Sequence, residues 1–451
     1  MNVLLISLYA LFLYSIHWLV NTPSVNLPES RNTDFFKPSK FFLLLVAFEI
    51  PFAFTVNSDP ELIPFYALKH IKDFDQVFLQ HFFNGFIFVS TVIIASVFTN
   101  PKIGILGKIL ETRLTDIKSL FVAHILLLVV TGISFIIFLE SIGGLYFLLL
   151  NIDSKTTLIA GTGYLQAAYN ISGAMSMGFL VMSYSKKEHI TLFNLLYVAF
   201  ILILIFLIFS AIGSRKGPIL FVIYFLLLWH YNINKLRFFT LRNITVGFIG
   251  LLYFSALPLF RTAGSFEFYM SNTPQLFQDS FENMGLFFQR FSELERSLMI
   301  YSLFDSSNLW LGSSFIDILY APIPRSLFPD KPPVDEGVYL YNIAHGNLVS
   351  PSTPLRKMMA VGWPPSTITN MYINFWYFGV GIGGLIYGYV LKYFYNFAKA
   401  QKFDAISVYL YTNVVFGTFA LTNRNIVGFA TTILFTFIIL KTISLVANLR
   451  T

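Results

Sequence analysis

Residues 190–212 read ITLFNLLYVAFILILIFLIFSAI, a run without a single charged side chain. A helix needs about 20 apolar residues to cross the hydrocarbon core of a bilayer. The run is therefore predicted to be a membrane-spanning helix. It is one of eleven apolar segments, which lie at 3–20, 41–57, 77–98, 118–138, 166–184, 190–212, 218–233, 240–259, 367–391, 405–422 and 425–446.

The whole chain has the composition of a membrane protein. Of its 451 residues, 56% are hydrophobic and only 12% are charged, against roughly 25% charged in soluble domains. The absence of cysteine excludes disulfides, thiolate nucleophiles and sulfur-ligated metal sites. No spacing of histidine and carboxylate residues resembles a metal site, and no cofactor is expected. The net charge is +7, but the basic residues mostly flank the spans, so nucleic acid is not an expected partner.

The orientation in the membrane follows from lysine and arginine in the short connections, which are enriched on the cytoplasmic side. One set of alternate connections holds most of these residues, whereas the opposite set holds Lys69, Lys72, Lys155, Arg215, Lys216 and Arg424. The N-terminus and the long segment that precedes residue 366 are therefore expected outside, and the C-terminus inside. The chain divides into spans at 1–259, an outer loop at 260–365 and further spans at 366–451.

The outer loop contains two patterns that predict local structure. Phe287, Phe291, Leu294 and Leu298 recur at helical spacing, which predicts an amphipathic helix resting on the membrane domain. Residues 321–333 read APIPRSLFPDKPP, with five prolines. Proline fixes φ and biases the preceding residue away from the helix, so this segment is predicted to be stiff, extended and non-helical.

Basic residues from three separate parts of the chain are expected on the outer face. They are Arg215 in the turn GSRKGP at 213–218, the cations of the outer loop, and Arg424 in the break TNRN at 422–425. Arginine near the hydrocarbon is costly and usually has a partner. Phosphate and pyrophosphate fit the guanidinium group best, and a lipid-linked pyrophosphate lies at this depth. An intramolecular ion pair or a topology signal is the alternative explanation for each arginine.

The sequence resembles a known family over about residues 200–446. IPRSLFPDKP at 323–332 resembles the hallmark loop of the Wzy-type O-antigen and related oligosaccharide repeat-unit polymerases. GSRKG at 213–217 resembles the glycine-flanked arginine turn of that family, and TITNMYINFWYFGVGIGG at 367–384 its span after the long loop. In this chain Asn370 stands where family members often carry a carboxylate, and Trp376 where a glycine is common.

The resemblance implies an enzyme of the bacterial inner membrane with a fold similar to the GT-C-type membrane glycosyltransferases. Such a polymerase transfers a growing glycan from undecaprenyl pyrophosphate onto the non-reducing end of a second lipid-linked repeat unit. Donor, acceptor and membrane lipid are the implied partners, with a chain-length regulator as a further candidate. The expected pyrophosphate ligands are Arg215, Arg290, Arg325, Lys331 and Arg424, and the candidate catalytic residues are Arg215, Arg325, Asp330, Glu293 and His345.

Two other functions are compatible with the sequence. An O-antigen ligase is also polytopic, uses the same donor lipid and has a large outer loop. A flippase or transporter of lipid-linked sugar is the alternative from another class, but transporters often show inverted repeats and carry charges at the bilayer midplane. Here most outward charges lie in loops, and no repeat is evident.

Overall fold

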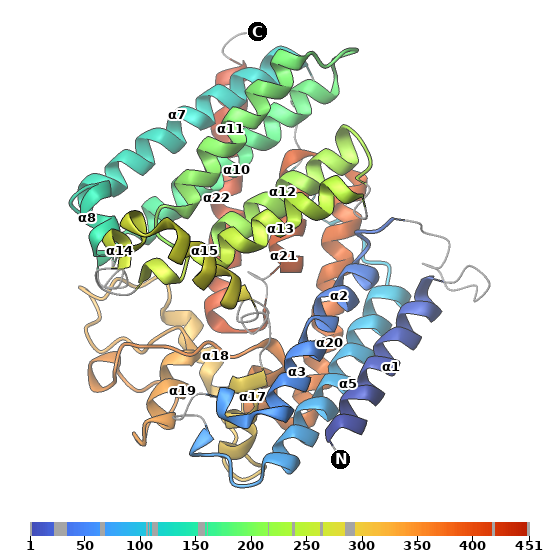
Figure 1. Cartoon of the computed structure of the whole chain (residues 1–451), viewed down its shortest axis with the longest axis vertical. Helices are drawn as coiled ribbons and strands as arrows, with labels where there is room; N and C mark the ends of the chain where they lie inside the picture. The colour runs from blue at the N-terminus through green and yellow to red at the C-terminus, as the bar shows by residue number, and fades with distance from the viewer. Residues whose placement is uncertain are drawn as a thin grey trace. The chain divides into compact units, whose positions relative to one another are not determined.

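The computed structural model describes residues 2–21, 34–63, 68–104, 107, 109–110, 116–151, 158–159, 161–214, 216–236, 240–261, 265–284, 294–416 and 420–448. Over these residues the chain is helical and contains no strand (Figure 1). It divides into two compact units. Unit 1 comprises residues 1–102, 288–396 and 414–430, and unit 2 comprises residues 103–287, 397–413 and 431–451.

Every segment that the hydropathy predicts to span the membrane is helical over most of its length. Six helical segments of the described chain are long and apolar enough to cross a bilayer: Asn2–Asn21, Pro38–Ser58, Phe74–Phe98, Ile117–Ser141, Leu192–Ser210 and Asn423–Ile443. The helices Asn243–Ala256 and Ala405–Phe416 are apolar but shorter. The prediction of a helical membrane protein is therefore confirmed, while the number of eleven spans stays a prediction.

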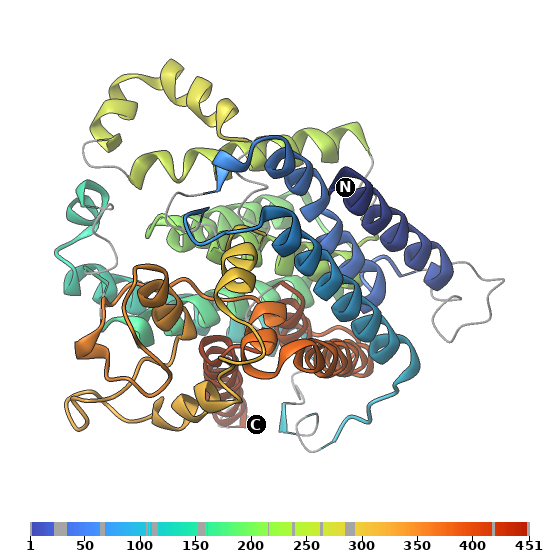
Figure 2. The ribbon, with the colours of Figure 1, turned by 90° about the horizontal axis from the view of Figure 1, so that it is seen from below.

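Unit 1 contains a group of apolar helices: α1 (Asn2–Asn21), α2 (Pro38–Ala47), α3 (Glu49–Ser58), α5 (Phe74–Phe98) and α20 (Thr367–Ala400) up to residue 396. Figures 1 and 2 show α1 beside α5, and α2 contacts both. A charged side chain inside this group has a partner, because Glu49 Oε1 of α3 lies 3.1 Å from His81 Nε2 of α5. Such pairing is usual for an ionisable residue within a span.

Glycine allows α20 to approach α5 closely. A Cβ atom at Gly388 would lie 2.3 Å from the carbonyl oxygen of Val92, and one at Gly384 would lie 2.9 Å from that of Phe88. Two small residues four positions apart let helix backbones meet inside a membrane, where packing rather than the hydrophobic effect holds helices together. The glycine-rich stretch of α20 is therefore a packing surface for α5.

A kink interrupts α20 at Phe375 and Trp376, whose φ/ψ angles are −142°/20° and 58°/−153°. The carbonyl of Ile373 at this break accepts a hydrogen bond from the backbone N–H of Trp310, at 3.0 Å. The N–H of Trp310 thus satisfies a carbonyl that the interrupted helix leaves without its usual partner. Irregular backbone in a membrane protein requires such a partner. The Trp376 ring stacks on Tyr372 with centroids 4.6 Å apart.

The backbone angles of Trp376 fall in a region that is essentially restricted to glycine. We expect Trp376→Gly to be more stable than Trp376→Ala by about 1 kcal/mol or more, because both lose the ring but only glycine relieves the strain. This order is the reverse of the usual helix preference, in which alanine is favoured. Melting temperatures of the two variants in the same detergent test it, and an alanine variant as stable as the glycine variant would contradict it.

Unit 2 contains α7 (Ile117–Ser141), α8 (Leu145–Leu150), α10 (Gly163–Ser185), α11 (Leu192–Ser210), α12 (Lys216–Asn232), α13 (Leu241–Ala256), α14 (Ser265–Ser271), α15 (Thr273–Glu282) and most of α21 (Ala405–Phe416). Small and polar side chains join α7 to α10. The Thr131 and Ser172 hydroxyl oxygens lie 2.8 Å apart, and Ser176 Oγ lies 2.8 Å from His124 Nδ1. Figure 1 shows α7, α10 and α11 side by side.

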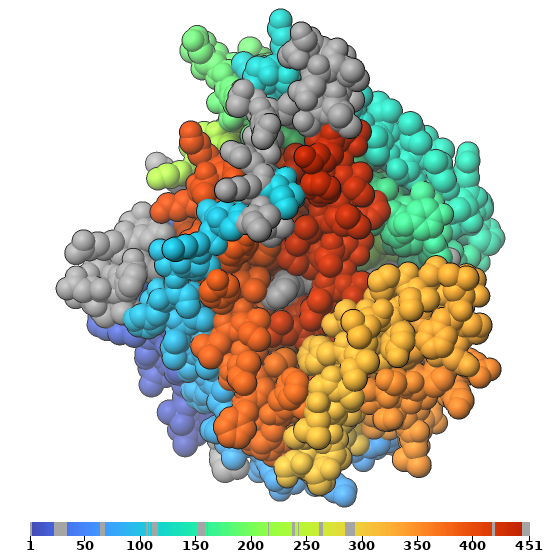
Figure 3. Space-filling view, turned by 180° about the vertical axis from the view of Figure 1, so that it is seen from behind, coloured from blue at the N-terminus to red at the C-terminus, as the bar shows by residue number. Residues whose placement is uncertain are grey.

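The loop elements of unit 1 begin with α17 (Leu294–Leu303), which packs on α5. Leu294 and Leu298 are buried in a helix, as the spacing predicts, but Met299 and Ile300 are buried as well, so the helix has no single buried face. Phe287 and Phe291 lie outside the described residues, and the amphipathic helix over 287–298 stays a prediction. The remaining elements are α18 (Ser313–Ile316), η5 (Asp317–Tyr320), α19 (Glu336–Ala344) and η6 (Leu355–Lys357). This part of the chain, yellow to light orange in Figure 3, forms a broad exposed surface beside the deeper orange of α20.

Candidate functional site

The proline-rich segment 321–333 is non-helical, as predicted, but it is folded into turns rather than extended. The N–H groups of Leu327 and Phe328 donate to the carbonyl of Pro324, and that of Lys331 donates to the carbonyl of Phe328 at 3.0 Å. Proline at 322, 324, 329, 332 and 333 excludes the helix. The intervening residues provide the N–H groups that close the turns, which is why the segment is compact.

Lys331 lies at the centre of this folded segment. Its side-chain amine donates to the carbonyls of Ala321, at 3.0 Å, and Ile323, at 2.7 Å, and the residue is only 8% exposed. Arg325 Nη1 donates to the carbonyl of Lys331 at 2.8 Å. Burial, with the nearby Arg325 guanidinium, lowers the pKa of the Lys331 ammonium. The segment thus holds two cations close together, and Arg325 is the exposed one.

Arg424 reaches the same part of unit 1 from the first turn of α22 (Asn423–Asn448). Its Nη1 atom lies 3.0 Å from Asp335 Oδ2. Asp335 also caps α19, because its Oδ1 accepts a hydrogen bond from the N–H of Gly337 at 2.9 Å. The start of α19 and the start of α22 therefore meet at an ion pair.

A buried carboxyl beside this ion pair fixes the two helix ends to each other. Glu336 is fully buried, and its Oε1 accepts the backbone N–H of Asn423 at 2.6 Å and Nδ2 of Asn370 at 3.2 Å. Burial raises the pKa of the Glu336 carboxyl to about 8. Asn370 Nδ2 also donates to the carbonyl of Leu421 at 2.7 Å. The position where the resembled family often carries a carboxylate is thus occupied here by an amide that contacts the carboxyl of Glu336.

Further buried polar groups hold the loop on α20. Asn374 Oδ1 accepts the N–H of Gly312 at 3.2 Å and the Ser314 hydroxyl at 3.0 Å. In the loop itself, the Tyr339 hydroxyl donates to Asp317 Oδ2 at 2.7 Å. Buried polar groups that are satisfied in this way specify one arrangement of the chain. Residues 312–352 are consequently part of a folded structure rather than a linker.

These elements line a pocket of about 470 Å³ that is open to the surface, which we name the basic cavity. Its lining residues are Ala321, Arg325, Lys331, Pro333, Val334, Asp335, Val338, Leu355, Ala360, Arg424, Val427 and Gly428. Three cations of the described chain line it, and they come from two of the three basic sites that the sequence predicts on the outer face. Arg325 and Arg424 each use only Nη1 in a hydrogen bond, to the carbonyl of Lys331 and to Asp335 Oδ2 respectively. Their other N–H groups make no hydrogen bond within the described residues.

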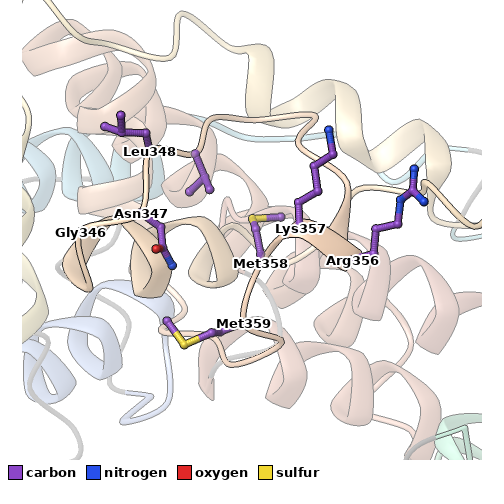
Figure 4. Close-up of a pocket in the computed structure, with 8 residues that line it drawn as sticks. Gly346, Asn347, Leu348, Arg356, Lys357, Met358 and Met359 are labelled. Atoms are coloured by element: carbon purple, nitrogen blue, oxygen red, sulfur yellow. The ribbon is translucent and has the colours of Figure 1, made fainter.

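A second cavity of about 620 Å³ lies in the same loop, between residues 346–349 and 356–359 (Figure 4). Arg356 and Lys357 extend along one side of it, and Gly346, Asn347 and Leu348 lie on the other. Arg356 forms an ion pair with Asp330, and both side chains are largely exposed. Leu355, which precedes Arg356 in η6, lines the basic cavity, so one turn separates the two cavities.

The remaining predicted site residues lie elsewhere or outside the described part of the chain. Asp330 lines neither cavity and pairs with Arg356. His345 is exposed at the end of α19, where its Nδ1 lies 2.7 Å from the carbonyl of Tyr341. Arg215, Arg290 and Glu293 lie outside the described residues. Among the described residues, no three His, Asp or Glu side chains gather in a way that could hold a metal ion.

Sequence reasoning missed Asp335 and Glu336. The available signal was weak: two adjacent acids follow the proline-rich segment and precede an apolar helical run. That pattern is typical of a helix N-terminus, and the N-cap role of Asp335 agrees with it. It does not indicate that the start of α22 packs there. Comparison of the chain with protein-family models, with curated proteins and with solved structures finds no match.

Proposed function

We propose that the chain is a membrane glycosyltransferase that polymerises lipid-linked oligosaccharide repeat units, and that the basic cavity holds the pyrophosphate of the undecaprenyl carrier. The observation that carries the proposal is the joint lining of one cavity by Arg325, Lys331 and Arg424. These cations come from segments about 90 residues apart in the sequence. The resemblance of residues 323–332 to the polymerase loop is the second support.

The geometry fits the chemistry of this transfer. The carrier pyrophosphate leaves as the anomeric carbon acquires positive character, so negative charge develops on the phosphate oxygens. Fixed cations that face this charge lower the barrier, and guanidinium groups bind phosphate through paired N–H donors. Arg325 and Arg424 supply such groups, while the buried amine of Lys331 holds the cavity wall. Arg215 and Arg290 remain proposed ligands of the same anion.

The proposal includes a topology. In it the chain has eleven spans, an outside N-terminus and an inside C-terminus, a GT-C-like arrangement and a place in the bacterial inner membrane. The basic cavity then lies on the outer side, where a flipped lipid-linked repeat unit presents its pyrophosphate. The leaving group is already activated, so the chemistry requires no nucleotide.

The proposal is tested in a strain whose own copy is deleted and which carries either the parent gene, Arg325→Ala or Arg424→Ala. We expect glycan ladders to collapse to single repeat units in both variants, because each removes a donor to the leaving pyrophosphate. Loss of one such donor typically costs about 10²–10³-fold in rate. Lys357→Ala is the matched control: this exposed cation lies in the same loop but lines the second cavity, and it should keep a full ladder.

Three results would count against the proposal. Full ladders in both arginine variants, at parent levels of membrane protein, would remove the pyrophosphate role. Polymer that accumulates on the carrier while lipid A stays bare would indicate a ligase. Repeat units that remain on the cytoplasmic leaflet would indicate a flippase.

A further inference from the structure

Among the described residues that line the basic cavity, Asp335 is the only acidic one. Its two oxygens have different partners: Oδ1 accepts the N–H of Gly337, and Oδ2 faces Nη1 of Arg424 at 3.0 Å. The first contact fixes the carboxylate at the start of α19. The second contact is with a side chain that is 63% exposed, whereas the Asp335 side chain is 21% exposed. Oδ1 is therefore held by a backbone N–H group, whereas Oδ2 is held by an exposed arginine side chain that can change its conformation.

The backbone under Asp335 is held rigidly. Gly337 packs so closely on the chain at Trp363 that a Cβ atom would lie 2.3 Å from the carbonyl carbon of that residue. The N–H of Trp363 donates to the carbonyl of Gly337 at 2.8 Å. Glu336 is anchored in turn to the backbone N–H of Asn423. Asp335 and Arg424 are consequently placed opposite each other by two independent anchors, rather than by their own attraction alone.

An incoming pyrophosphate competes directly with Asp335 for Arg424. A phosphate group offers several charged oxygens in the geometry that guanidinium binds best, whereas Asp335 engages Arg424 through a single oxygen. An exposed ion pair contributes only about 0–1 kcal/mol, so its exchange for a phosphate contact has a small cost. When Arg424 turns to the phosphate, Oδ2 of Asp335 loses its partner and faces the cavity as an acceptor.

We propose that Asp335 is the proton acceptor of the glycosyl transfer, and that Arg424 masks it until the carrier pyrophosphate is bound. This inference rests on the proposed function. In the step, the acceptor hydroxyl gives its proton to Asp335 Oδ2, and the oxygen electron pair forms the bond to the anomeric carbon. The bond between that carbon and the pyrophosphate oxygen breaks, and its electron pair leaves on the pyrophosphate, which Arg325 and Arg424 face. The proton on Asp335 passes to water when the products depart.

The other described acids and bases of the loop fit this role less well. Asp330 is paired with Arg356 and lines neither cavity. Asp317 is fully buried and accepts hydrogen bonds from Tyr339 and Ser352. His345 lines neither cavity. Among the described acids and bases of the loop, Asp335 alone combines a place in the cavity wall with a partner that the substrate can remove.

The test separates binding from turnover in the purified full-length protein. Carrier binding is measured with undecaprenyl pyrophosphate in lipid nanodiscs, and turnover by the growth of lipid-linked repeat units. Asp335→Asn keeps an oxygen that can cap Gly337, since asparagine is as good an N-cap as aspartate. We expect it to bind the carrier as tightly as the parent or more tightly, because the competing negative charge is gone. Turnover should fall by about 10²–10⁴-fold, which is the usual contribution of a general base.

Matched variants complete the design. Asp335→Glu should restore part of the turnover, and Asp305→Asn, which changes an exposed aspartate of the same loop outside both cavities, should match the parent. Arg424→Ala should weaken carrier binding, which Asp335→Asn does not. Two outcomes overturn the role of Asp335 as proton acceptor. In the first, the turnover of Asp335→Asn stays within a few fold of that of the parent. In the second, the variant loses carrier binding together with turnover. A parent protein that binds no carrier overturns the proposed function itself.

Discussion

Replacing Gly337 by alanine is expected to destabilise the loop that contains α19. The new Cβ would lie 2.3 Å from the carbonyl carbon of Trp363, 2.4 Å from the nitrogen of Pro364 and 2.6 Å from the carbonyl oxygen of Trp363. All three are backbone atoms, so no side-chain rotation can relieve the contact. The start of α19 would have to move away from the backbone of residues 363–364. Asp335 and Glu336 would move with it.

The expected size follows from what such overpacking costs. Inserted methyl groups that force backbone shifts cost typically about 1–3 kcal/mol and sometimes more. Each kcal/mol lowers the melting temperature of a domain of roughly 150–250 residues by about 2–4 °C, and the shift is smaller for a longer chain. We therefore expect Gly337→Ala to melt a few degrees below the parent in a thermal-shift assay. Under the proposed function, the variant should also lose polymerisation, because Asp335 is displaced from the wall of the basic cavity. The assay should use the full chain in detergent at one fixed pH.

A second glycine supplies the control. Gly250 lies inside α13, and a Cβ atom there would meet nothing within 4 Å. Alanine is favoured over glycine in a helix interior by roughly 1 kcal/mol, so Gly250→Ala should melt at the parent temperature or slightly above it. Equal melting temperatures for Gly337→Ala and Gly250→Ala would show that the start of α19 can shift without cost, which would contradict the packing described above.

Hydropathy was sufficient to locate the helices because the bilayer imposes a local requirement on each span. The run at 192–210 needs no knowledge of its neighbours to be identified as a helix. The proline-rich segment shows where local reasoning stops. Proline excluded a helix correctly, but the turns around Lys331 depend on carbonyls of Ala321 and Ile323, which only the folded chain brings to its amine.

The candidate site could be predicted only in part for the same reason. Charge and topology indicated that Arg325 and Arg424 would reach one face, and the structure places both on one cavity. Asp335 and Glu336 gave no comparable signal, since their partners on α22 lie almost 90 residues further along the chain. Conversely, Asp330 was a candidate catalytic residue from the sequence, whereas folding pairs it with Arg356.

The buried carboxyl of Glu336 should make the stability of the protein fall as the pH rises. In the unfolded chain this group has its ordinary pKa of 4.5, and in the folded chain burial raises the pKa to about 8. Between these two values the unfolded state gives up the proton while the folded state retains it. The unfolded state then binds fewer protons, so the free energy of unfolding decreases by about 1.4 kcal/mol for each pH unit. The loss is complete above pH 8, where both states are ionised.

Glu336→Gln removes this dependence while it preserves the contacts, because an amide oxygen can still accept from the N–H of Asn423 and from Asn370. We expect the variant and the parent to melt at similar temperatures near pH 4.5, and the variant to melt increasingly above the parent up to pH 8. The exposed Glu282 provides a control, since Glu282→Gln changes a surface side chain and should shift the melting temperature by only a small amount. A constant or shrinking difference between Glu336→Gln and the parent would mean that Glu336 is ionised in the folded protein. The carboxylate would then require a cation at Oε2, which has no hydrogen-bond partner among the described residues.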